Sequence, residues 1–137
     1  MTLRFVGCAV LVMALAACAA PSAPEPGGSP ARLILDPSVT RRNPSAGVLT
    51  VRRDAATFSD ECRHRIFLDG SPVADLRPNE VITIYALPGP HILRAEQTGS
   101  SCHGGNEIAA TSERGKWRAF VTTDPASSGA LLTATME

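Results

Sequence analysis

Short runs in which apolar and polar residues alternate, separated by turn residues, fill the chain from residue 46 onwards. This period of two is typical of β-strands with one buried face. Asp69-Gly70 between two such runs is a strong hairpin signal, because both turn residues must accept positive φ. The predicted strands span residues 46–53, 63–68, 71–76, 79–87, 91–97, 106–111, 116–123 and 130–136. No segment has a long helical period, so we predict an all-β domain, an antiparallel β-sandwich of about seven strands.

The pattern is different at the start of the chain, where residues 5–15 form one unbroken apolar run after Arg4. A bilayer-spanning helix needs about 20 apolar residues, so this run predicts a signal peptide over residues 1–17. The run ends in Leu15-Ala16-Ala17-Cys18, which resembles the lipobox of bacterial lipoproteins. That resemblance implies cleavage before Cys18 and covalent lipid, including palmitate, on that cysteine. With Ala19 following it, we expect the periplasmic leaflet of the outer membrane.

Residues 18–45 are rich in Pro, Ala, Gly and Ser. Such a composition buries too little apolar surface to offset the entropy lost on ordering, so we predict a disordered tether. Leu33, Ile34 and Leu35 are its apolar spot and predict a short edge strand. The folded domain is then expected over residues 46–137.

Charge excludes one class of partner. The chain has 13 basic and 13 acidic residues, and loss of Arg4 with the signal peptide leaves 12 and 13. A near-neutral chain lacks the positive field that nucleic-acid-binding proteins use, so no nucleic acid is expected as a partner.

The segment FLDGSPVADLRPNEVITIYALPGPHIL, residues 67–93, resembles the core of a family of small bacterial envelope lipoproteins of unknown function, and more distantly PEGA-type surface domains. The shared features are Asp-Gly after an apolar strand, and Pro-Gly with His before another. The resemblance implies a sandwich of transthyretin-like or carbohydrate-binding-like shape with no established activity. Gly70 and Gly89 correspond to the turn glycines of the pattern.

Four cysteines and three histidines are the candidates for chemistry. Cys8 leaves with the signal peptide and Cys18 carries lipid, so Cys62 and Cys102 are left to form a disulfide in an oxidising compartment. Two alternatives stay open: an exchangeable redox pair, and a metal site built from Cys62, His64, Cys102 and His103. No cofactor is expected beyond the lipid on Cys18.

The other candidates have structural interpretations beside the functional ones. We expect His64 to be a half-buried neighbour of the disulfide, His91 to begin a strand, and His103 to be exposed. Trp117 is expected to pack in the core; stacking on a sugar is the alternative, because Lys116 and Arg118 flank it. Since the sequence contains no Gly-x-Ser-x-Gly elbow, phosphate loop or paired-histidine zinc motif, we expect no catalytic residues and no enzyme.

These features together predict a lipid-anchored periplasmic protein whose β-domain acts by contact. Its expected partners are the membrane, through the lipid anchor, and other envelope components, either proteins or peptidoglycan.

Overall fold

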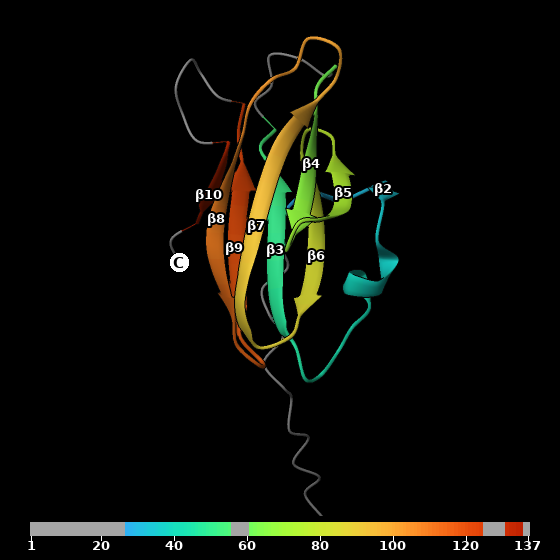
Figure 1. The fold of residues 1–137 in the computed structure, drawn as a ribbon. Coiled ribbons are helices and arrows are strands. Elements are labelled where there is room, and N and C mark those ends of the chain that lie inside the picture. Colours follow the sequence, from blue (N-terminus) through green and yellow to red (C-terminus); the bar gives the residue numbers. More distant parts are fainter. Residues whose placement is uncertain (1–26, 56–60, 125–130, 136–137) are drawn as a thin grey trace, which may run out of the picture.

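The structure is a computed structural model of the 137-residue chain that describes residues 27–55, 61–124 and 131–135. Within these ranges the chain forms ten strands and one short 3-10 helix (Figure 1). The elements are β1 (Ser29–Pro30), β2 (Leu33–Ile34), η1 (Pro37–Thr40), β3 (Gly47–Arg53), β4 (Arg63–Leu68), β5 (Ser71–Leu76), β6 (Glu80–Ala86), β7 (Gly89–Thr98), β8 (Gly105–Ser112), β9 (Trp117–Thr122) and β10 (Leu132–Ala134).

The strands form two five-stranded sheets that lie face to face. Sheet A has the order β1-β6-β3-β9-β10, and sheet B has the order β2-β5-β4-β7-β8. Figure 1 shows β4, β7 and β8 of sheet B in front of β3, β6 and β9 of sheet A. The predicted all-β sandwich is therefore confirmed. Its sheets are not purely antiparallel, because β3 runs parallel to β9 and β1 runs parallel to β6.

The core lies between the sheets and follows the alternation of each strand. Leu49 and Val51 of β3 face Ile66 of β4 and Leu93 of β7 across the sandwich, and all four side chains are essentially inaccessible to solvent. Burial of a side chain of this kind contributes about 1.5–3 kcal/mol to stability.

Two turns are fixed by residues with positive φ, as the sequence pattern predicts. Asp69 (φ 50°) and Gly70 (φ 84°) form the hairpin turn between β4 and β5, and Gly89 (φ 128°) follows β6. The turns are joined by side chains: Asp69 accepts hydrogen bonds from the Ile92 amide at 2.8 Å and from His91 Nδ1 at 2.6 Å. His91 lies inside β7 rather than at its first residue, and its role is to tie one turn to the other.

The N-terminal edge of the sandwich uses residues that we assign to the tether. β1 pairs with β6 in sheet A, β2 pairs with β5 in sheet B, and η1 packs beside β6. Ala31 and Val39 pack against the core as the segment crosses the edge. The domain therefore includes Ser29 and does not begin at residue 46, because pairing with two sheet edges supplies the backbone partners that a free linker lacks. The edge strand expected at Leu33 is present.

The opposite edge is closed by one side chain. Asn106 of β8 donates from Nδ2 to the Leu132 carbonyl at 2.9 Å and accepts at Oδ1 from the Leu132 amide at 2.7 Å. This pair of bonds links β8 of sheet B to β10 of sheet A in the way that a neighbouring strand would.

Candidate functional site

The predicted disulfide between Cys62 and Cys102 is present, with 5.7 Å between the Cα atoms. It joins the residue before β4 to the loop between β7 and β8. Cys102 is buried. A cysteine pair held in this bond offers no thiolate to a metal ion.

His64 is fully buried rather than half-buried. Its Nε2 lies 2.9 Å from Asp124 Oδ1, and its Nδ1 lies 2.9 Å from Thr122 Oγ1. Both ring nitrogens are therefore engaged within the protein. In the described part of the chain, no group of three or more His, Cys, Asp or Glu residues is placed to hold a metal ion. The alternative metal set of Cys62, His64, Cys102 and His103 is not assembled.

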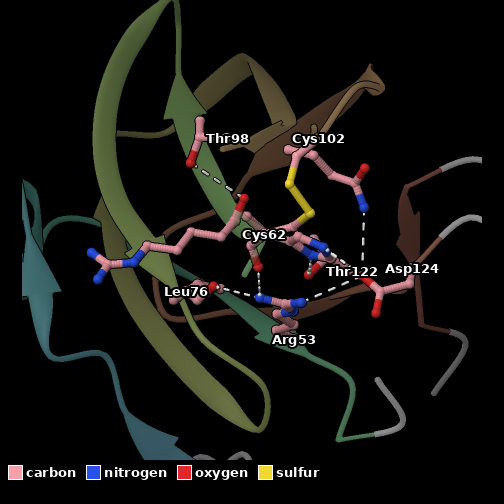
Figure 2. Close-up of polar contacts among 10 residues, drawn as sticks. Arg53, Cys62, Leu76, Thr98, Cys102, Thr122 and Asp124 are labelled. Atoms are coloured by element: carbon pink, nitrogen blue, oxygen red, sulfur yellow. Dashed lines mark hydrogen bonds and ion pairs between the residues drawn. A yellow bond between two sulfur atoms is a disulfide. The ribbon is translucent and has the colours of Figure 1, made fainter. Parts of the chain in front are cut away.

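Arg53 completes a buried polar cluster that we define by Arg53, His64, Thr122 and Asp124. Figure 2 shows the Arg53 guanidinium between the end of β9 and the residue before β4. Its Nη1 donates to the carbonyls of Cys62 at 2.6 Å and Leu76 at 3.1 Å, and its Nη2 lies 3.4 Å from Asp124 Oδ1. A buried charge of this kind is costly without partners, and these acceptors offset that cost.

The protonation of the polar cluster follows from its burial. Burial, together with the positive charge of Arg53, lowers the pKa of His64 to about 4, and the hydrogen bond with Asp124 offsets only part of this. The imidazole is therefore neutral at pH 7. Because a carboxylate can only accept, Nε2–H donates to Asp124, and Nδ1 accepts from the Thr122 hydroxyl.

This chain of hydrogen bonds, hydroxyl to imidazole to carboxylate, has the connectivity of an acyl-transfer triad. Access decides what it can do. The Thr122 and His64 side chains are both fully buried, so a substrate carbonyl cannot reach Thr122 Oγ1 in this conformation. The polar cluster acts as internal structure that fixes β3, β4 and β9 to one another beside the disulfide.

His103 is exposed, as expected, in the loop that carries the disulfide. It lines an open hollow of about 490 Å³ together with Gln97 and Asn106. The hollow is adjacent to Cys102, but among the described residues no hydrogen bond joins His103 to its neighbours, so the loop gives it no defined chemical partner there.

Trp117 is not in the core, contrary to our expectation. Its strand β9 buries the alternate set, Phe120 and Thr122, whereas Trp117 is half-buried on the opposite face. That face is the outer face of sheet A, meaning the side away from sheet B. The indole Nε1 is covered and has no hydrogen-bond partner among the described residues.

Tyr85 lies on the same outer face. The strand register pairs Tyr85 of β6 with Val48 of β3, and Val48 with Trp117 of β9. We call Tyr85, Val48 and Trp117 the aromatic row. The row crosses three adjacent strands and contains the only tyrosine and the only tryptophan of the chain. Tyr85 was not among the candidates identified from the sequence. Its place near the end of the predicted central strand 79–87 was visible in the sequence, but its alignment with Trp117 was not.

A hollow of about 390 Å³ adjoins the aromatic row at Trp117. Glu113, Lys116 and Thr135 contribute polar groups to its wall. Phe120 of β9 and Ala109 of β8 also line it, so the hollow lies at the edge of the sandwich where the two sheets meet, beside Trp117 and away from Tyr85. Lys116 Nζ lies 2.6 Å from Glu113 Oε2, so the two charges are paired at its rim. An aromatic wall with a polar rim is a common composition for a small-molecule site.

The outer face of sheet B has a different character. Arg65 makes a two-bond ion pair with Asp75, at 2.7 and 2.9 Å, and Arg94 pairs with Glu96. The Arg94 guanidinium also lies 4.0 Å from the centre of the Phe67 ring. The charges of Arg65 and Arg94 and the Phe67 ring therefore already have partners within the sheet.

Comparison with known proteins found no matching family model, no matching curated protein and no matching solved structure. Within residues 27–55, 61–124 and 131–135, no helix is long and apolar enough to cross a membrane. Cys18 and the predicted signal peptide lie outside the described residues.

Proposed function

We propose that the protein is a lipid-anchored component of the bacterial envelope whose sandwich binds other envelope components without catalysing a reaction. Cys18 would carry the lipid, and the segment before Ser29 would connect the sandwich to the periplasmic leaflet of the outer membrane. The observation that carries the binding role is the aromatic row. Two large amphipathic side chains, Tyr85 and Trp117, lie half-buried on an outer face and do not contribute to the core.

Burial supports the non-enzymatic part of the proposal. The residues with catalytic connectivity, His64 and Thr122, are inaccessible, and the pKa of His64 is too low for a general base that works at neutral pH. The side chains that line the hollow at Trp117 suit binding, because they combine an aromatic surface with paired charges.

The anchor is tested by metabolic labelling with palmitate in a bacterial host. The wild-type protein is expected to be labelled and to fractionate with the outer membrane, and Cys18→Ala is expected to lose both properties. Cys8→Ala is the matched control, because Cys8 lies in the segment expected to be removed and its substitution leaves the label intact. An unlabelled wild-type protein that is freely soluble in the periplasm contradicts the proposal.

The binding face is tested by photo-crosslinking in intact cells. A photoreactive residue at Thr83, which neighbours the aromatic row on the outer face of sheet A, is expected to capture an envelope component. The same residue at Thr111, exposed on β8 of sheet B, is the control and is expected to capture nothing specific. Equal capture at both positions would show that sheet A has no special role.

A further inference from the structure

We infer that the aromatic row binds a glycan strand of β-linked sugars, with Tyr85 and Trp117 stacked against two sugar rings of one strand. The inference rests on the proposed function and names the chemical class of its partner. The geometry that points to it is the placement of the two aromatic side chains on one flat face.

The register fixes the separation of the two aromatic side chains. β6 and β9 both pair with β3, so the Tyr85 and Trp117 backbones are two strand spacings apart, about 10 Å. That distance exceeds one sugar ring and is comparable to two linked rings. An extended β-linked strand lying along the row therefore brings different rings over Tyr85 and Trp117.

The residues between and beside the two aromatic side chains are small or β-branched. Val48 separates them, and the next row across the same strands is Thr83, Thr50 and Ala119. Thr50 is only 2% exposed, so its surroundings cover it, and a ligand on this face would contact Tyr85 and Trp117 rather than Thr50. Small side chains between two aromatic side chains leave room for the ribbon of a β-linked glycan to lie along the row.

The hollow at the edge of the sandwich provides polar contacts at the Trp117 end of the row. Sugars present hydroxyl and amide groups around an apolar ring face, so their sites combine an aromatic surface with hydrogen-bonding side chains. Thr135, Lys116 and Glu113 supply such groups beside Trp117. The indole Nε1–H has no acceptor in the described part of the chain, and a rotation of the ring toward a bound sugar would give it one.

Binding is tested on the full lipoprotein in detergent micelles with two probes, insoluble peptidoglycan sacculi and a soluble β-1,4-linked oligomer of N-acetylglucosamine. Trp117→Ala and Tyr85→Ala are each expected to weaken binding about tenfold, the loss typical of one aromatic stacking contact. The double variant is expected to lose measurable binding. Phe67→Ala is the matched control, because Phe67 is a partly exposed aromatic residue on the outer face of sheet B, and it is expected to bind like the wild type.

Fluorescence gives a second readout that does not depend on variants, because Trp117 is the only tryptophan. Addition of the soluble oligomer to the wild type is expected to shift its emission to shorter wavelength and to protect it from acrylamide quenching. Unchanged emission, or equal binding by the wild type and both alanine variants, overturns the inference.

The failure of this inference is distinguishable from failure of the proposed function. Capture of a protein at Thr83, with no retention on sacculi, overturns glycan binding but leaves a lipid-anchored contact domain. Absence of palmitate on the wild type overturns the anchor while the sacculus assay still reports on the aromatic row.

Discussion

His64 and His91 each have both ring nitrogens engaged, yet at mildly acidic pH His64 is expected to be neutral and His91 positively charged. A neutral imidazole has one donor and one acceptor, whereas the charged form has two donors. His64 lies between one donor, the Thr122 hydroxyl, and one acceptor, Asp124, which suits the neutral ring. His91 lies between two acceptors, Asp69 Oδ2 and the Leu87 carbonyl, each at 2.6 Å, which suits the charged ring.

His91 is therefore expected to stabilise the fold in its charged form. Partial burial opposes the charge, but the hydrogen bonds to Asp69 and to the Leu87 carbonyl outweigh it and raise the pKa of His91 above 6.5. A group whose pKa is raised on folding contributes its full share of stability at pH values below its unfolded pKa, near 6.5. That stabilisation is lost as the pH rises through the pKa of the folded state. His91→Gln is expected to lower the free energy of unfolding by about 1 kcal/mol at pH 5.5, a modest figure because Asp69 is half exposed. Urea unfolding at pH 5.5 and 9 checks this, and a loss that grows with pH would contradict it.

His64 is expected to have the opposite pH dependence. With its pKa lowered to about 4 on folding, the unfolded chain binds more protons between pH 4 and 6.5. Stability is then complete above pH 6.5 and declines toward pH 4, by an amount on the order of 3 kcal/mol. His64→Gln keeps an N–H donor for Asp124 and is expected to reduce that slope. Titration by NMR should give a pKa near 4 for His64 and a pKa above 6.5 for His91. A His64 resonance that titrates with a pKa near 6.5 would exclude the buried neutral ring.

At the scale of the element, β10 is a short strand that a side chain of the other sheet helps to hold. It has three residues and pairs with β9 along one edge only, while Asn106 supplies two hydrogen bonds from the other sheet. Asn106→Ala is expected to lower the free energy of unfolding by about 1–3 kcal/mol. It is also expected to speed amide exchange at Leu132 and Thr133. Thr111→Ala is the control, because Thr111 is an exposed residue of β8, the strand that carries Asn106. Equal amide exchange in both variants would show that β9 alone holds β10.

The positions of the strands were predictable from the sequence. The pairing of the strands and the buried face of each strand were less predictable. β4 and β5 have the predicted bounds because Asp69-Gly70 sets where the hairpin turns. Alternation does not say which face is inward when both faces carry apolar residues. On β9, Trp117 and Val121 lie on one face, and Phe120 and Thr122 lie on the other. The face with the polar threonine is the buried one, because His64 gives the Thr122 hydroxyl a hydrogen-bond partner. Alternation also does not distinguish the parallel β3–β9 pairing from an antiparallel one.

At the scale of the whole molecule, the disulfide was predictable and the polar cluster was not. Cys62 and Cys102 were identified by elimination among four cysteines, which needs no geometry. Arg53 follows Leu49 and Val51 on the core face of β3, so its inward position was visible. Its charged partner Asp124 lies 71 residues away, and only the packing of the sheets brings the two together.

Removal of the disulfide is expected to loosen the polar cluster as well, because Cys62 is bonded to Cys102 and also contacts Arg53. The bond closes a loop of 40 residues, worth about 3–4 kcal/mol in the chain-entropy model, and Cys62 also presents its carbonyl to Arg53. The Cys62→Ser, Cys102→Ser double variant is therefore expected to unfold at a lower urea concentration than the wild type. Its His64 pKa is expected to rise from about 4 toward 6.5, because a loosened end of the sandwich admits water to the imidazole. His91, at the Asp69 turn, serves as the internal control and should titrate as in the wild type. A double variant with unchanged stability and an unchanged His64 pKa would show that packing alone maintains this end of the domain.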